Sequence, residues 1–142
     1  MIKSITGIKI YGTKDNTCEI TESYHMITFF NSLRINFPET YGAIAIHVRN
    51  ESKRTAQQIA KHRMEGLVKG CSDIIIPGNP SFVCEMKSRS PKAKISDEQI
   101  KYLLAAQNNG SFVCIALGCE AAWEAFNDWR KLNDENKRKD IK

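Results

Sequence analysis

The order of apolar segments predicts a mixed α/β fold for this chain of 142 residues. Segments with helical spacing alternate with short apolar runs rich in β-branched residues, in the order helix, strand, helix, hairpin, helix, strand, helix. Alternation of this kind is typical of a sheet packed against helices. The length favours one domain over residues 1–142, because two ordinary cores need a longer chain.

Four segments have apolar residues at the spacing of one helical face. Thr21, Ser52 and Ser96 are good N-cap residues at the start of three of them, and Gly70 and Gly110 are suitable C-caps. The expected helices cover about 21–36, 52–69, 96–110 and 119–132. The charged end, 133–142, is expected to be a fraying tail.

The strands are expected where apolar and β-branched residues concentrate. Residues 43–48 predict one strand, and 111–117 form a continuous apolar run that predicts a buried one. Residues 72–77 and 81–87 predict a hairpin joined by Gly78 and Asn79. Residues 1–20 alternate weakly and predict a short strand or arm followed by a loop.

Composition places the chain among globular proteins, with 42% hydrophobic and 26% charged residues. The net charge of +5 modestly favours an anionic partner. No apolar run is long enough to span a bilayer and the start is too polar for a signal peptide, so an intracellular, cytoplasmic protein is expected. The five cysteines include no Cys-x-x-Cys pair, which favours reduced core thiols over disulfides or a zinc site.

The predicted hairpin carries the most informative residues of the chain. Side chains alternate along a strand, so Glu85 and Lys87 share one face while Met86 points to the other. With Asp73 on the preceding strand, two carboxylates and an ammonium group meet in one place. Such a cluster suits a divalent cation held by carboxylate oxygens, with the lysine beside a bound water or phosphate. This chemistry is that of phosphodiester hydrolysis.

An acid on one strand and an acid-x-lysine on the next resemble the signature of the PD-(D/E)XK nuclease superfamily. Further matching residues are Glu22 at the start of the first helix, His47-Val-Arg-Asn50-Glu51, Gly70-Cys-Ser-Asp73, and Gln99 on the third helix. This set, over about residues 22–118, resembles the VRR-NUC (virus-type replication-repair nuclease) branch. The resemblance implies a restriction-endonuclease-like core, with a central mixed β-sheet flanked by helices.

The resemblance also implies roles for individual residues. Asp73 and Glu85 would bind Mg²⁺ or Mn²⁺, with the Met86 carbonyl as a further ligand and Glu22 binding directly or through water. Lys87 would orient or deprotonate the attacking water, or stabilise the charge of the transition state; next to two acids it is expected to act first as a permanent positive charge. Gln99 would hold the metal ligands in position without binding the metal itself. Asn50, Glu51 and Arg54 would supply supporting and phosphate contacts.

Simpler explanations exist for several of these residues. Asp73 alone resembles a turn or cap residue, and Glu85 has an alternative as half of an ion pair on an exposed sheet face. For Glu22, helix capping and catalysis both remain open. Gln99 shares a helical face with apolar residues, so its amide is expected to point towards the hairpin. His47 is expected to be a satisfied strand histidine.

Basic residues without an intervening acid follow the hairpin directly. Arg89, Lys92 and Lys94 therefore predict a path for phosphates beside the carboxylates, which the basic face of the second helix would extend. Trp123 and Trp129 are expected to pack the last helix against the sheet rather than to stack on bases.

Together these residues and the resemblance predict a metal-dependent DNA endonuclease, and the resemblance implies that it is structure-specific. Stand-alone proteins of the branch that the chain resembles act on branched DNA as homodimers, so branched DNA such as a Holliday junction is the expected substrate, in a phage setting. The alternatives are a nonenzymatic nucleic-acid-binding module and a nuclease of less specific substrate that nicks DNA or cleaves flaps.

Overall fold

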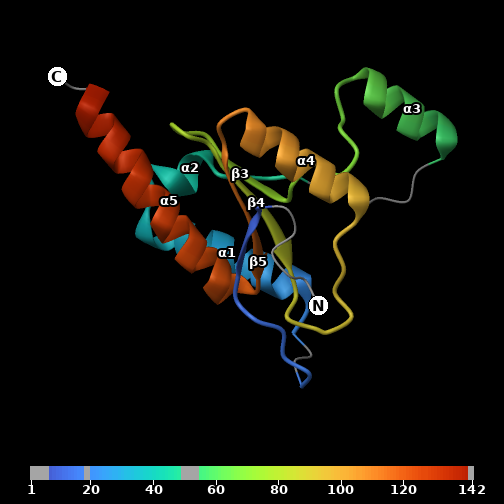
Figure 1. Ribbon diagram of the computed structural model, residues 1–142, viewed down its shortest axis with the longest axis horizontal. Coiled ribbons are helices and arrows are strands. Elements are labelled where there is room, and N and C mark those ends of the chain that lie inside the picture. The colour runs from blue at the N-terminus through green and yellow to red at the C-terminus, as the bar shows by residue number, and fades with distance from the viewer. Residues whose placement is uncertain (1–6, 18–19, 49–54, 141–142) are drawn as a thin grey trace.

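A five-stranded mixed sheet forms the centre of the computed structural model, which describes residues 7–17, 20–48 and 55–140 (Figure 1). The strand order is β1-β5-β4-β3-β2, with β1 and β4 parallel to β5 and the β2-β3-β4 part antiparallel. The strands are β1 (Lys9–Tyr11), β2 (Ile46–His47), β3 (Ile74–Ile76), β4 (Phe82–Lys87) and β5 (Phe112–Leu117). The predicted fold class is confirmed.

Helices cover both faces of this sheet. They are α1 (Glu22–Asn36), α2 (Tyr41–Ile44), α3 (Ala56–Met64), α4 (Asp97–Asn108) and α5 (Cys119–Asp140). Helix α4 packs on one face, while α1, α2 and α5 cover the other. Helix α3 stands apart from the other helices in Figure 1, and none of its residues is buried. No described helix has the length and apolar character that a membrane span requires.

Aromatic side chains hold α1 and α5 to the sheet. Phe29 of α1 and Phe126 and Trp129 of α5 are at most 1% exposed, and Phe82 of β4 packs against both α5 rings. Burying a side chain of this size contributes roughly 2–3 kcal/mol. The Trp129 Nε1 also donates a hydrogen bond to the Pro80 carbonyl over 2.6 Å. Both tryptophans lie in or against this core, so the predicted packing role is confirmed.

The strand predicted over 43–48 is wrong in its first half. Residues Tyr41–Ile44 form a short helix, and only Ile46–His47 pair with β3. The buried Tyr41 ring lies against Phe126 and Trp129, and its hydroxyl donates to Asp134 over 2.7 Å. This tertiary anchor overrides the β propensity of the apolar run.

The second helix is shorter than predicted. Thr55 caps it through a capping box with Gln58, and it ends at Met64, before a turn in which Gly66 has a φ of +102°. The predicted N-cap Ser52 lies outside the described residues. Gly70, the predicted C-cap, instead has a φ of +79° in the turn that approaches the start of α4.

The last helix is longer than the sequence predicts. Helix α5 continues to Asp140, so the fraying tail is wrong from 133 to 140. Its polar residues are anchored on the hairpin turn, where Asn133 accepts from the Asn79 amide over 2.9 Å and Asn136 donates to the Asn79 carbonyl over 2.7 Å. At the other end, Lys9–Tyr11 is the short strand of the two predicted alternatives, and it pairs with β5 at the edge of the sheet.

Candidate active site

The hairpin brings Asp73 and Glu85 together. Ile74 pairs with Cys84 in the antiparallel register of β3 and β4, so Asp73, one residue before β3, comes opposite Glu85. Cys84 and Met86 pack into the core beneath α1 and α5. Because side chains alternate along β4, Glu85 points to the opposite face, which α4 covers.

Glu85 is fully buried, with 0% of its surface exposed. Its Oε2 accepts a hydrogen bond from Nε2 of Gln99 over 3.2 Å and lies 3.8 Å from Nζ of Lys87. Its Oε1 is buried and accepts no hydrogen bond in the part of the chain that the structure describes. An ion pair on an exposed sheet face, the simpler explanation for Glu85, therefore does not fit.

The Glu85 carboxyl holds a proton at neutral pH, because its pKa is raised to about 10. Burial is the largest cause, followed by a hydrogen bond with the Asp73 carboxylate and the negative charge of Asp73. Lys87 opposes the shift, and the charge of Glu22 adds to it. The two carboxyl groups thus titrate together, and the proton that they hold neutralises one of their two negative charges.

The surrounding backbone fixes Asp73. Its Oδ2 accepts the Met86 amide over 3.1 Å, across the hairpin. Its carbonyl accepts the Val48 amide over 2.8 Å and Nδ1–H of His47 over 3.0 Å. His47 is therefore a hydrogen-bonded residue of β2, as expected, and it joins the edge strand to the acid pair.

Two polar residues from the helices approach the pair from different elements. Gln99 is the third residue of α4, and its Oε1 accepts the Ser96 amide in a capping box while its Nε2 reaches Glu85. Glu22 is the first residue of α1, and it is half-buried. Its charge acts on Glu85, so it lies on the same side of the molecule as the pair.

The donor set suits a divalent cation. Carboxylate oxygens are the ligands that Mg²⁺ and Mn²⁺ prefer, and the buried Oε1 of Glu85 accepts no hydrogen bond from the described residues. No group of three or more His, Cys, Asp or Glu side chains within the described ranges is arranged around a metal position. Metal binding by Glu22 and by the Met86 carbonyl therefore stays a prediction.

The predicted phosphate path is described only in part. Asn50 and Arg54, together with Glu51, lie outside the described residues. Arg89 is half-buried, and its Nε donates to the Thr13 carbonyl over 2.9 Å. Lys92 and Lys94 are exposed.

The segment after β1 forms hydrogen bonds with the basic loop, residues 88–95. These contacts were not predicted from the sequence. Lys14 donates from Nζ to the Ala93 carbonyl over 2.6 Å, and the Asp15 amide donates to the Arg89 carbonyl over 2.8 Å. No local pattern signals these contacts, because they join segments more than seventy residues apart.

Comparison with known proteins finds a similar solved structure but no match by sequence. No model of a known family matches the sequence, and no curated protein matches it. A solved structure described as a VRR_NUC domain protein superposes with a TM-score of 0.70 and 16% sequence identity, over 82% of this chain and 93% of that chain. The chain therefore has the fold of a VRR_NUC domain protein, which is a restriction-endonuclease-like core.

Proposed function

We propose that this protein is a metal-dependent endonuclease that hydrolyses phosphodiester bonds in DNA. The observation that carries the proposal is the buried pair of Asp73 and Glu85, with Lys87 beside it. The VRR_NUC domain protein of the same fold supports it. Residues 1–142 are proposed to form one such domain, acting in the cytoplasm.

Asp73 and Glu85 would hold Mg²⁺ or Mn²⁺, with the Met86 carbonyl and Glu22 as further ligands. When bound, the metal supplies a water of lowered pKa and positive charge at the scissile phosphate. Glu85 has to lose its proton for this role. Gln99 keeps its carboxylate in place, because the amide is fixed at its other end by Ser96.

Lys87 is proposed to act as a fixed positive charge. Its ammonium group lies 3.8 Å from Glu85, and its side chain is only 11% exposed, so few alternative positions are open to it. From there it orients the attacking water and stabilises the negative charge that develops on the phosphate. Proton abstraction by Lys87 is the less favoured role.

The DNA backbone is proposed to approach along the basic loop. Lys92 and Lys94 are exposed beyond the hairpin, and Lys61 and Arg63 are exposed on the protruding α3. Arg89, Asn50 and Arg54 would contribute nearer the acids. This distribution supports contacts to phosphates, which position the duplex without reading its sequence.

The substrate is proposed to be branched DNA, with a Holliday junction as the most specific case. Two symmetric incisions require two sites, which a homodimer supplies. Ile27 and Ile35, two turns apart on α1, are 59% and 78% exposed and offer apolar surface for such a dimer. A phage origin is part of the same proposal, by resemblance alone.

The proposal is tested by cleavage of linear, nicked, flap and four-way DNA in Mg²⁺, Mn²⁺, Ca²⁺ or EDTA. We expect cutting in Mg²⁺ or Mn²⁺, binding without turnover in Ca²⁺, and no cutting in EDTA. The Glu85→Gln variant keeps the volume and the hydrogen bond from Gln99 but removes the ionisable group, so it should bind DNA and not cut it. Cutting by Glu85→Gln at the parent rate would refute the proposal.

The same variants separate the nuclease from a nonenzymatic nucleic-acid-binding module. A binding module should tolerate Asp73→Asn, Glu85→Gln and Lys87→Ala without a change in function. A nuclease should lose cutting while DNA affinity holds or rises, because the two acid substitutions remove negative charge from the path of the phosphates.

A further inference from the structure

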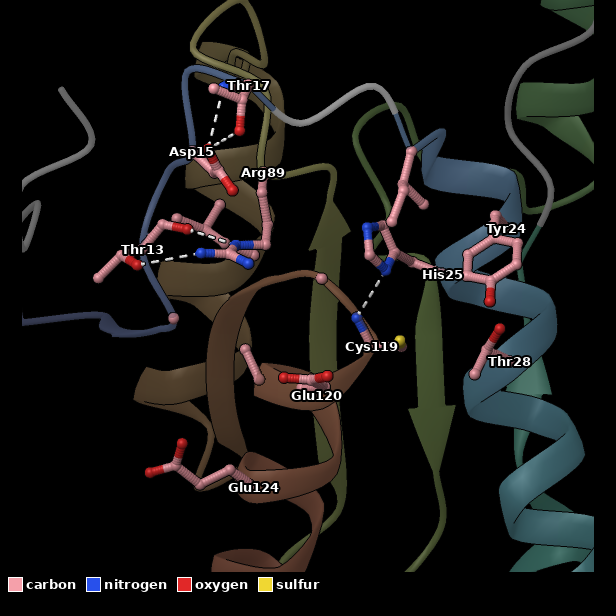
Figure 2. Close-up of a pocket in the computed structure, with 15 residues that line it drawn as sticks. Thr13, Asp15, Thr17, Tyr24, His25, Thr28, Arg89, Cys119, Glu120 and Glu124 are labelled. Carbon is pink, nitrogen blue, oxygen red and sulfur yellow. Dashed lines mark hydrogen bonds between the residues drawn. The ribbon is translucent and has the colours of Figure 1, made fainter.

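A cleft of about 760 Å³ opens at the N-terminus of α5, beside the proposed active site (Figure 2). Its walls come from α1, the segment after β1, the residues after β4 and the first turn of α5. A volume of this size lies within the range of small-molecule sites. The proposed reaction uses none of the cleft's lining residues except Arg89, so the cleft needs its own explanation.

His25 of α1 presents an unused hydrogen-bond donor at this cleft. Its Nδ1 accepts the Cys119 amide at the start of α5 over 2.9 Å. The lone pair on Nδ1 is thereby occupied, so in the neutral ring the proton sits on Nε2. The residue is only 5% exposed, and its buried Nε2 has no hydrogen-bond partner among the described residues. Buried donors are rarely left unpaired without a purpose.

Arg89 and this imidazole both border the space that a side chain at Gly118 would occupy. A Cβ added at Gly118 would meet Cε1 of His25 at 3.2 Å and Cδ of Arg89 at 3.3 Å. Figure 2 shows the ring nitrogen that Cys119 does not contact turned towards the side of Arg89. The Arg89 charge also helps to lower the pKa of His25, after burial, which keeps the ring neutral. A neutral N–H, a guanidinium and a helix N-terminus together favour an anion.

Three carboxylates also line the cleft. Glu120 and Glu124 are exposed on the first turns of α5, and Figure 2 places Glu124 well away from His25 and Arg89. Asp15 already accepts the Thr17 amide and hydroxyl, at 2.9 and 2.8 Å. Glu120 and Asp15 lie nearer, since the charge of Glu120 acts on His25 and that of Arg89 acts on Asp15. The seat for an anion is assigned to the His25 and Arg89 end because the N–H donors of the cleft lie there.

An exposed aromatic ring lies next to that seat. Tyr24 lines the cleft, and 55% of its surface is exposed. Its ring meets the His25 ring edge to face, with the centroids 6.0 Å apart. A flat exposed ring beside an anion seat is suited to a nucleobase, because every base has a face that stacks on an aromatic side chain.

The cleft adjoins the proposed active site along two elements. His25 follows Glu22 by one turn of α1, and Arg89 follows Lys87 by two residues along the chain. The Gly118 amide, at the floor of the cleft, donates to the Lys87 carbonyl over 2.9 Å. The cleft is therefore connected to the proposed active site through neighbouring residues of α1 and of the segment after β4.

We infer that this cleft binds one unpaired nucleotide of the substrate next to the cleaved bond, with its phosphate between His25 and Arg89 and its base against Tyr24. The inference rests on the proposed nuclease function and narrows its substrate. A base reaches Tyr24 only when it has left the duplex stack. Branched DNA supplies such nucleotides at the branch point, whereas a continuous duplex does not.

The first test uses the full chain, labelled with ¹⁵N-histidine, in EDTA. Thymidine 5′-monophosphate, thymidine and inorganic phosphate are titrated while the His25 Nε2–H and Tyr24 ring signals are followed by NMR, assigned by their loss in His25→Gln and Tyr24→Leu. We expect the monophosphate to shift both signals and phosphate to shift only His25. Thymidine should bind at least tenfold more weakly than the monophosphate. If the monophosphate shifts neither signal, or binds no more tightly than both phosphate and thymidine, the inference is wrong.

The second test measures DNA affinity in Ca²⁺, for a four-way junction, a single strand and a fully paired duplex. Tyr24→Leu should weaken binding to the first two roughly tenfold and leave the duplex unchanged, while Tyr24→Phe, which keeps the ring, should match the parent. For the variant Arg89→Ala the control is Arg34→Ala, which also removes one positive charge but lies at the far end of α1 from His25. An equal loss on all three DNAs for Tyr24→Leu would overturn the inference.

These measurements fail independently of the proposed function. A protein that cuts none of the DNAs in Mg²⁺ or Mn²⁺ would remove the nuclease proposal while leaving the thymidine monophosphate titration interpretable. A protein that cuts in Mg²⁺ but whose His25 and Tyr24 signals ignore the nucleotide would keep its nuclease function and lose only the nucleotide site.

Discussion

Gln99 donates from Nε2 to Oε2 of Glu85 across 3.2 Å, and the other end of the same amide completes the capping box of α4. The orientation of the amide is thereby determined twice, since its oxygen is committed to the Ser96 backbone and its nitrogen to the acid. The start of a helix and a buried carboxyl group share one side chain. Helix stability and site geometry are consequently linked at Gln99.

Replacing Gln99 by alanine should therefore have two effects. It should lower the free energy of unfolding by about 1 kcal/mol through the lost cap. It should also lower the rate of DNA cleavage tenfold to a hundredfold, as the loss of a residue that supports a metal ligand typically does. Urea unfolding and single-turnover cleavage measure the two effects separately.

Helix α3 offers a matched control for this prediction. Thr55 and Gln58 form the same capping box there, and no residue of that helix is buried. Gln58→Ala should lower the free energy of unfolding by as much as Gln99→Ala does, or by less, and it should leave the cleavage rate unchanged. Equal losses of activity in Gln58→Ala and Gln99→Ala would mean that the contact with Glu85 does not matter.

The raised pKa of Glu85 predicts that the metal-free protein becomes less stable as pH rises. The pKa is about 10 in the folded protein, against about 4.3 for an unfolded glutamate. Between these values the folded state carries a proton that the unfolded state has lost, so the free energy of unfolding falls with increasing pH, by roughly 1 kcal/mol per pH unit from this group. Urea unfolding in EDTA at several pH values from 6 to 8 measures the slope.

Glu85→Gln removes this titration and should flatten the slope, which makes the variant more stable than the parent at pH 8. Glu120→Gln, which alters an exposed carboxylate on α5, should retain the parent slope. A parent whose stability is independent of pH in this range, with EDTA present, would show that Glu85 is ionised in the folded state.

The sequence was sufficient to predict the hairpin and its acids, because local rules govern them. Strand alternation places Glu85 and Lys87 on one face, and the turn residues between β3 and β4 set the pairing that brings Asp73 opposite Glu85. The Ser96 cap with Gln99 three residues later is likewise a local pattern. Each of these features depends on residues close together in sequence.

The features that prediction missed depend on contacts between distant segments. Tyr41 becomes helical because its ring packs under α5, and Asn133 extends that helix by bonding to the hairpin turn. His25 gave no signal in sequence beyond its place one turn after Glu22. Its significance comes from the Cys119 amide, 94 residues away, which occupies one ring nitrogen and leaves the other available.

The basic loop predicts a specific dependence of DNA binding on salt. Lys92 and Lys94 are exposed, so their proposed contacts are with phosphates rather than base edges. Each alanine substitution should weaken binding in Ca²⁺ similarly for all sequences, and should reduce the slope of log affinity against log salt by about 1. Lys131→Ala, at an exposed position on α5, serves as the control. An unchanged slope in the Lys92→Ala, Lys94→Ala double variant would place the DNA elsewhere.

Two glycines give the last prediction, which concerns the packing between His25 and Arg89. Gly118 and Gly110 have φ values of +95° and +100°, so alanine at either position costs about 1–2 kcal/mol in backbone strain. A Cβ at Gly110 would meet nothing within 4 Å, whereas at Gly118 it would press on His25 and Arg89. The neighbours cannot easily yield, because Cys119 holds the His25 ring and Lys87 holds the Gly118 amide. Gly118→Ala should therefore lower the urea midpoint clearly more than Gly110→Ala and displace the His25 Nε2–H signal, and equal midpoints would mean that these side chains are not packed against Gly118.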